Sequence, residues 1–91
     1  MAMSKYCGFA YDPHALDYLK TAPKKTRRQI INKIQRLAAE PYPPTSKLIQ
    51  GMVNGEERVY RIRSGDYRIL YVVRGIIVVI LDINHRKDVY R

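Results

Sequence analysis

The stretch that decides the fold is Val59-Tyr60-Arg61-Ile62-Arg63-Ser64-Gly65-Asp66-Tyr67-Arg68-Ile69-Leu70-Tyr71. It predicts two β-strands joined by the loop Gly65-Asp66, because glycine in the first loop position suits a type II′ turn. The predicted pairs are Ser64 with Tyr67, Arg63 with Arg68, Ile62 with Ile69, Arg61 with Leu70 and Tyr60 with Tyr71. Paired residues share a face of a sheet, so this register separates an apolar face from a face that carries the arginines. A three-residue loop would set Ile62 against Arg68 and mix charge into both faces.

The length and composition predict one small domain, residues 1–91. The single cysteine, Cys7, cannot form a disulfide within the chain, and the N-terminal residues do not resemble a signal peptide. We therefore expect a cytoplasmic protein. The longest strongly apolar run, Ile76 to Leu81, is far shorter than the roughly 20 residues that span a bilayer, so no integral membrane protein is expected.

The charge of the chain predicts a polyanionic partner. Seventeen Lys and Arg residues against eight Asp and Glu give a formal net charge of +9. Nucleic acid is the first expectation, and anionic lipid or an acidic protein is the alternative. From Leu48 onward Lys87 is the only lysine, and the other basic residues are arginines, whose planar fork matches phosphate oxygens.

Two helices are expected before the hairpin. A first strand, Tyr6 to Tyr11, ends at Asp12-Pro13, which suits the N-cap and first position of a helix that buries Ala15, Leu16 and Leu19. Pro23 opens a second helix that ends at Pro41. Its apolar stripe consists of Ile30, Ile31, Ile34, Leu37 and Ala38. Its basic side, which includes Lys24 and Arg27, is either a solvated surface or a contact with RNA.

The segments beside the hairpin complete a small sheet. Lys47 is expected to be exposed and Leu48 to anchor its loop to the core, and Asn54-Gly55 marks a turn. A loop at Arg74-Gly75 would pair Val73 with Ile76 and set Arg68 opposite Leu81. In that register Ile83 and His85 extend the arginine face, and strict alternation turns Arg86 away. The predicted fold is α+β, with two N-terminal helices on the apolar face of an antiparallel-rich sheet and the arginine face open.

The open face suggests metal-free chemistry on RNA. His14 and His85 are far apart in sequence, the acids do not cluster at ligand spacing, and Cys7 has no evident activating base, so neither a metal or cofactor site nor a nucleophilic triad is expected. RNA carries its own nucleophile, the 2′-OH. Arginines that orient a phosphate and stabilise its developing charge can therefore supply much of the catalysis.

Three motifs resemble the RelE toxins of the RelE/ParE toxin–antitoxin superfamily. They are Lys47-Leu48-x-x-Gly51, the segment Tyr60 to Tyr71, and the ending His85-Arg86-Lys87-Asp88-Val89-Tyr90-Arg91. The likeness in order and size covers nearly the whole chain, and the ending favours the RelE branch. The resemblance implies a ribosome-dependent endoribonuclease that cuts mRNA in the decoding site and is held inactive by a RelB-like antitoxin.

The resemblance also implies roles for individual residues. Arg61 and Arg63 match the basic strand residues that hold the phosphate, and Arg68 matches the arginine that stabilises the phosphorane. Arg86 matches the proposed general acid and Tyr90 the proposed general base. The expected RNA-binding residues are Lys47, Arg61, Arg63, Arg68 and His85.

Two departures and two rival functions accompany this interpretation. The positions of Arg61 and Arg63 are often lysine in well-known relatives, and arginine transfers protons poorly. The sequence also ends at Arg91, one residue after Tyr90, which makes the placement of Tyr90 a second departure. His85, with its unperturbed pKa near 6.5, is the alternative proton acceptor. A ParE-like toxin would inhibit DNA gyrase by protein–protein contact, and a non-catalytic RNA-binding module is the third possibility.

Overall fold

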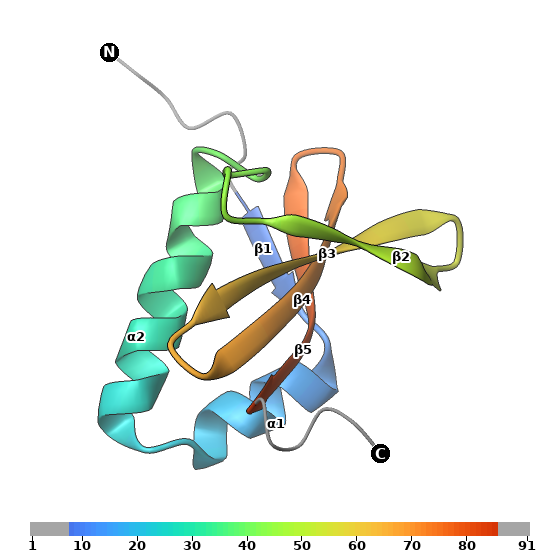
Figure 1. Ribbon diagram of the computed structural model, residues 1–91. Helices are drawn as coiled ribbons and strands as arrows, with labels where there is room; N and C mark the ends of the chain where they lie inside the picture. The colour runs from blue at the N-terminus through green and yellow to red at the C-terminus, as the bar shows by residue number, and fades with distance from the viewer. Residues whose placement is uncertain (1–7, 86–91) are drawn as a thin grey trace.

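The chain forms a five-stranded sheet with two helices on one of its faces (Figure 1). The computed structural model describes residues 8–85. Its elements are β1 (Gly8–Tyr11), α1 (Pro13–Thr21), α2 (Lys24–Gln35), a 3-10 turn (Arg36–Ala38), β2 (Lys47–Asn54), β3 (Glu57–Ser64), β4 (Tyr67–Arg74) and β5 (Ile77–His85). The strand order is β1-β5-β4-β3-β2, with β1 parallel to β5 and the other neighbours antiparallel. The predicted α+β architecture is confirmed.

The central hairpin has the predicted register. Strands β3 and β4 pair from Tyr60 opposite Tyr71 through Arg63 opposite Arg68. Gly65 has a φ of 60°, and no residue other than glycine has a positive φ in residues 8–85, as expected for a type II′ turn. The arginines are therefore separated from the apolar side chains as the alternation indicated.

The helices begin where the sequence predicts but bury somewhat different residues. Asp12 caps α1 by accepting a hydrogen bond from the His14 backbone N–H at 2.9 Å. Leu16 was expected in the core and is 40% exposed, because α1 turns only a narrow stripe toward the sheet. Helix α2 ends at Gln35, before the predicted stop at Pro41, and its last turn tightens into the 3-10 turn.

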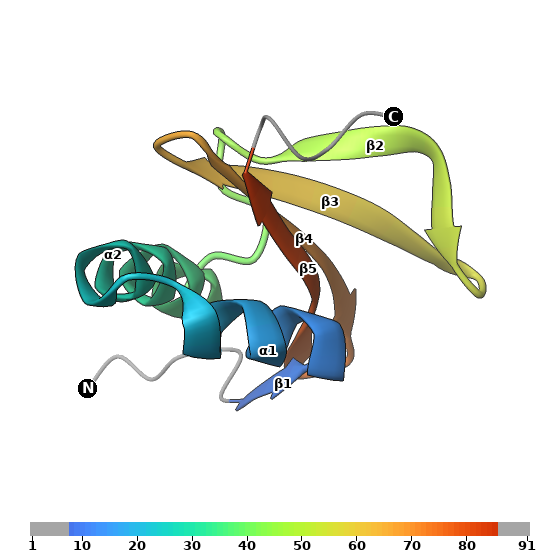
Figure 2. The ribbon, with the colours of Figure 1, turned by 90° about the horizontal axis from the view of Figure 1, so that it is seen from below.

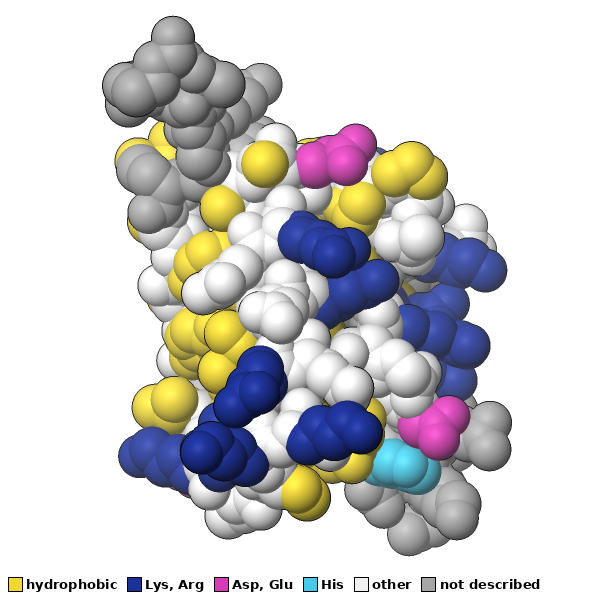
Figure 3. Space-filling model, turned by 90° about the vertical axis from the view of Figure 1, so that its left-hand side faces the viewer, with side chains coloured by type: hydrophobic (Ala, Val, Ile, Leu, Met, Phe, Trp, Pro, Cys, Tyr) yellow, Lys and Arg dark blue, Asp and Glu magenta, His cyan; other side chains and the backbone are white. Residues whose placement is uncertain are grey.

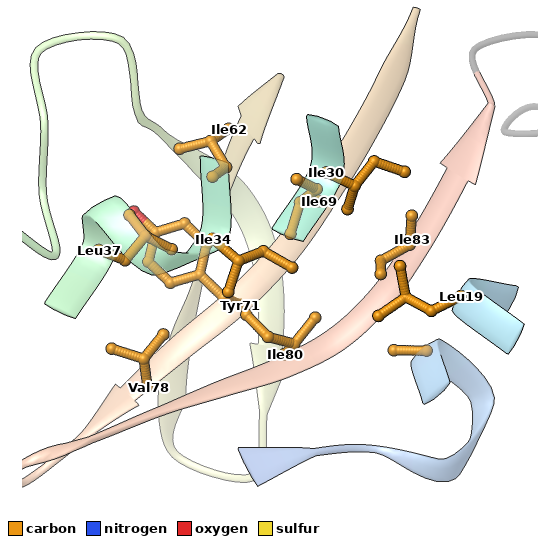
Figure 4. Packing of buried hydrophobic residues seen from close by; sticks show 11 residues of the cluster. Leu19, Ile30, Ile34, Leu37, Ile62, Ile69, Tyr71, Val78, Ile80 and Ile83 are labelled. Atoms are coloured by element: carbon orange, nitrogen blue, oxygen red, sulfur yellow. The ribbon is translucent and has the colours of Figure 1, made fainter. Parts of the chain in front are cut away.

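The core lies between the helices and one face of the sheet (Figure 4). Its fully buried residues are Ala15, Ile30, Ile34, Leu37, Ile62, Ile69, Tyr71, Val78, Ile80 and Ile83. Tyr71 is the largest of them, and its hydroxyl donates a hydrogen bond to the Pro41 carbonyl oxygen at 2.6 Å. This bond ties the middle of the sheet to the loop that leads into β2. Burial raises the pKa of Tyr71 to about 12.

The last strand departs from the predicted register. The loop between β4 and β5 is Gly75-Ile76, so Arg74 pairs with Ile77 and Val73 with Val78 rather than Ile76. A bulge then falls between the pairs Tyr71–Ile80 and Leu70–Asp82, which leaves Leu81 as the extra residue. Without the bulge, strict alternation would place one of Ile80 and Ile83 away from the core. With it, both are buried.

The bulge corrects the predicted arginine face. Arg68 lies opposite Asn84, not Leu81, and Ile83 pairs with Ile69 on the helix side. His85 pairs with Tyr67, and the two rings meet at right angles with centroids 5.0 Å apart. Neither Ile83 nor His85 therefore extends the arginine face. The predicted orientation of Arg86 lies outside the described residues.

Strand β2 lies on the side of the sheet away from the helices (Figure 2). Its pairing with β3 shifts between Leu48 and Val53, so residues 49–52 arch across Val59 without regular pairing. Leu48 was expected to anchor its loop to the core, but it is 40% exposed and belongs to the last regular pair before the shift in β2. Lys47 is exposed as predicted. In residues 8–85 no helix is both long and apolar enough to cross a membrane.

Candidate nucleic-acid interface

A groove of about 330 Å³ runs between the arch of β2 and the open face of the sheet. It is lined by Lys47, Leu48, Ile49, Met52, Arg61, Arg63, Arg68, Leu70 and Asn84. The expected RNA-binding residues Lys47, Arg61, Arg63 and Arg68 all line this groove, and His85 does not. We call it the arginine groove. No acidic side chain lines the groove in residues 8–85, so its character is cationic and apolar.

Strand pairing sets the positions of the cations. Lys47 of β2 lies opposite Arg61 of β3, and Arg63 lies opposite Arg68 of β4. Arg61 and Arg63 are two residues apart on one strand and so project from the same face. Four cations from three adjacent strands thereby converge, although pairs of like charge repel each other. A bound anion would reduce this repulsion.

The cationic surface continues beyond the groove. Lys33 of α2 and Thr45 line an adjoining hollow together with Lys47, Arg61 and Arg63. Figure 3 shows the side of the molecule on which α2 lies, where Lys and Arg side chains far outnumber Asp and Glu. The path from the arginine groove toward α2 is therefore basic.

Helix α2 carries a second, shallower basic hollow. It is lined by Lys24, Arg27, Arg28, Ile31, Asn32 and Gln35. The Arg27 guanidinium is partly engaged, since Nη2 donates to the Ala22 carbonyl oxygen at 3.0 Å. This hollow shares no residue with the arginine groove.

Asn84 is a groove residue that the sequence interpretation missed. Its Nδ2 donates to Asp82 Oδ2 at 2.9 Å, and Asp82 Oδ1 accepts from the Ile83 backbone N–H at 2.9 Å. The stretch Ile80-Leu81-Asp82-Ile83 carries no local signal for the bulge, because Leu81 and Ile83 are two residues apart and fit unbroken alternation.

Two predicted catalytic residues, Arg86 and Tyr90, lie outside the described residues. Among the described residues, the structure brings together Lys47, Arg61, Arg63 and Arg68. His85 lies on the other face of the sheet. In residues 8–85 no three His, Cys, Asp or Glu side chains come close enough to hold a metal ion.

Comparison with known proteins defines the class. Residues 9–90 match the family model described as ParE toxin of type II toxin–antitoxin systems. A comparison with curated protein sequences finds no match. The fold is accordingly that of a toxin from a type II toxin–antitoxin pair.

Solved structures place the chain further within that class. The RelE–RelB complex of Pyrococcus horikoshii matches with a TM-score of 0.74 and 26% identity, over 90% of this chain and 96% of that chain. The antitoxin–toxin complex RelB–RelE of Methanococcus jannaschii matches with a TM-score of 0.69 and 27% identity, over 89% and 94%. The RelBE2 complex of Mycobacterium tuberculosis matches with a TM-score of 0.74 and 25% identity, over 93% and 95%.

The chain belongs to the ParE toxin family of the RelE/ParE superfamily, and it is a RelE-type toxin by its structural relatives. The resemblance to RelE toxins that the three motifs indicated is thereby confirmed.

Proposed function

We propose that this protein is a ribosome-dependent endoribonuclease that cuts mRNA in the decoding site and so inhibits translation. The observation that carries the proposal is the convergence of Arg61, Arg63 and Arg68 on one groove free of acidic side chains. Arginine forks match the paired oxygens of a phosphodiester, and fixed cations stabilise the charge that develops on a phosphorane. RNA is the fitting substrate because its 2′-OH supplies the nucleophile.

The proposed reaction needs no metal. The 2′-oxygen attacks the adjacent phosphorus and the bond from phosphorus to the 5′-oxygen breaks. The upstream product ends in a 2′,3′-cyclic phosphate and the downstream product begins with a 5′-hydroxyl. In this proposal Tyr90 takes the proton from the 2′-OH, Arg86 gives one to the leaving 5′-oxygen, and Arg61, Arg63 and Arg68 hold the phosphate.

The ring contact of His85 with Tyr67 favours Tyr90 over His85 as the proton acceptor, because His85 points to the helix side of the sheet. Tyr90→Phe removes the acceptor but keeps the ring. We expect it to lower the cleavage rate with little change in ribosome binding, and His85→Ala to have a smaller effect. A larger loss of single-turnover rate in His85→Ala than in Tyr90→Phe would exchange the two roles.

The direct test incubates the purified protein with programmed ribosomes and maps the mRNA ends. We expect cuts in the codon at the decoding site and none in the same mRNA without ribosomes. A matched mRNA with one 2′-deoxy nucleotide immediately 5′ of the cut should bind and resist cleavage there. Normal cleavage of the deoxy substrate would rule out internal attack, and with it the roles of Tyr90 and Arg86.

An antitoxin is the proposed protein partner. The three solved relatives named above are complexes of a toxin with its antitoxin. The net charge of +9 favours fast association with an acidic protein, and a RelB-like antitoxin would cover part of this surface. The test is co-expression with the neighbouring reading frame. A neighbour that neither co-purifies nor restores growth would remove this support.

A second candidate function follows from the family model, which is described by its ParE members. A ParE-like toxin would inhibit DNA gyrase by contact, without cutting RNA. Supercoiling assays with purified gyrase separate the two. Inhibition of gyrase together with intact mRNA on ribosomes would establish this function in place of the nuclease.

A further inference from the structure

Nearly half of the residues that line the arginine groove are apolar. They are Leu48, Ile49, Met52 and Leu70. Met52 is 43% exposed, and Leu70 is the direct partner of Arg61 across the β3–β4 pair. Leu70 also lies two residues from Arg68 on the same strand, so it shares a face with the arginines.

A site for phosphate alone does not require these side chains. Open faces of antiparallel sheets normally carry polar residues, and an apolar side chain that stays exposed to water there gains none of the free energy of burial. Apolar surface next to clustered cations fits a ligand that has both characters within one small unit. A nucleotide is such a ligand, since its phosphate is anionic and the faces of its base are apolar.

We infer that Leu70 and Met52 form a contact surface for one base of single-stranded RNA, beside the phosphate held by the arginines. The inference rests on the proposed function and deepens it by naming where a base of the substrate packs. Leu70 forms part of the floor from β4, and Met52 approaches from the arch of β2, so that the base lies between two strands. The phosphate then reaches Arg61 or Arg68 within the same groove.

The chemistry of the contact predicts how the groove discriminates. Leucine and methionine offer no hydrogen-bond donor, so they recognise the face of a base and not its edge. Every base has such a face, and contact of this kind tolerates changes of sequence. The loss on removing the base should therefore exceed the differences among the four bases.

The combination of cations with apolar side chains favours RNA as the occupant of this groove. No acidic side chain lines it, and four cations from three strands converge there. RNA supplies one phosphate per base, so each nucleotide brings an anionic group and an apolar face to the groove together.

The test compares two short fluorescent RNAs by anisotropy at low salt. One is intact, and the other lacks a single base but keeps that ribose, its 2′-OH and every phosphate. We expect the wild-type protein to bind the intact strand about five- to tenfold more tightly, the scale of one base contact. In Met52→Ala and Leu70→Ala the ratio should fall to about twofold or less.

Two controls separate the base contact from charge and from folding. Val53→Ala changes the neighbouring residue of β2, which is 61% exposed and does not line the groove, and it should keep the wild-type ratio. Arg63→Ala should weaken both strands by the same factor. Thermal melting checks that Leu70→Ala still folds, and Met52→Ala tests the inference without touching the sheet interior.

The outcomes are distinct from those that test the nuclease. Equal binding of intact and abasic strands by the wild type, or no RNA binding at low salt, would overturn the base contact even if ribosomes are cut. An abasic loss that disappears in Met52→Ala would support it even if no cleavage is seen. Loss of affinity for the antitoxin in Met52→Ala, with RNA binding unchanged, would assign the groove to the antitoxin and overturn the inference.

Discussion

Replacing Tyr71 with Phe should destabilise the protein through the loss of a buried hydroxyl group. The Tyr71 side chain is fully buried, and its hydroxyl donates to the Pro41 carbonyl oxygen at 2.6 Å. Tyr71→Phe keeps the ring in the core and leaves that carbonyl without its donor. An acceptor left unsatisfied in a buried position costs about 1–3 kcal/mol.

Thermal unfolding is the measurement. For a domain of this size, each 1 kcal/mol lowers the Tm by about 4–8 °C, so we expect a fall of roughly 5–15 °C. Tyr60→Phe is the matched control. Tyr60 lies in the same aromatic group, with its ring centroid 6.0 Å from that of Tyr71, and no hydrogen bond of its hydroxyl is found in residues 8–85. Loss of the Tyr60 hydroxyl should change the free energy of unfolding by less than about 0.5 kcal/mol.

The pH dependence gives an independent check of the same bond. Burial raises the pKa of Tyr71 to about 12, above its usual value of 10.0. The protonated phenol is therefore favoured in the folded state, and its contribution is complete below pH 10 and lost as the pH rises toward 12. The stability of the wild type should converge on that of Tyr71→Phe over this range. A constant difference between the two proteins from pH 9 to 12, or equal Tm values at neutral pH, would refute the reasoning.

Three further predictions concern the core, the site and an exposed ion pair. Ile83→Ala should lower the free energy of unfolding by about 2–5 kcal/mol in denaturant titrations, because Ile83 is buried on the helix side; a change below 1 kcal/mol would contradict the bulged register. Arg68→Ala should reduce single-turnover cleavage about 10²-fold or more, whereas Arg27→Ala should alter ribosome affinity and its salt dependence; equal rate losses would mean that charge alone matters. Arg74 holds the pKa of Glu57 below its usual value of 4.5, so this ion pair stabilises the fold above pH 4.5 and the stabilisation is lost as the pH falls below that value. Glu57→Gln should make the free energy of unfolding less dependent on pH in the acid range. An unchanged pH profile in this variant would contradict the prediction.

Local signals predicted the first hairpin well. The register of β3 and β4 followed from the loop Gly65-Asp66 and from the alternation of five residue pairs, and it is confirmed. The same reasoning applied to the next hairpin placed glycine second in the loop. The structure has Gly75 first, with a φ of 61°, as Gly65 has. If glycine had been placed first in this loop, as in Gly65-Asp66, the sequence would have predicted the loop Gly75-Ile76 correctly.

The bulge at Leu81 was beyond local reasoning. It is decided by contacts with residues distant in the chain, since Ile80 and Ile83 both reach a core that the helices help to form. Because the sequence interpretation did not include the bulge, it exchanged the faces of His85 and Asn84. It therefore assigned His85, one of five predicted RNA-binding residues, to the arginine face of the sheet. The four cations before the bulge were placed together as predicted.

The arch of β2 has a consequence for the behaviour of the protein in solution. β2 is an edge strand, and Met52 and Val53 present apolar side chains on it. A regular edge of this kind would offer unpaired backbone groups to another copy and invite sheet-to-sheet aggregation. The irregular stretch from residue 49 to residue 52, with Gly51 at a φ of 79°, breaks that row of donors and acceptors. The same irregular stretch borders the groove and interrupts the exposed edge. A deletion that made β2 a regular strand should therefore remove the groove and promote aggregation of the protein.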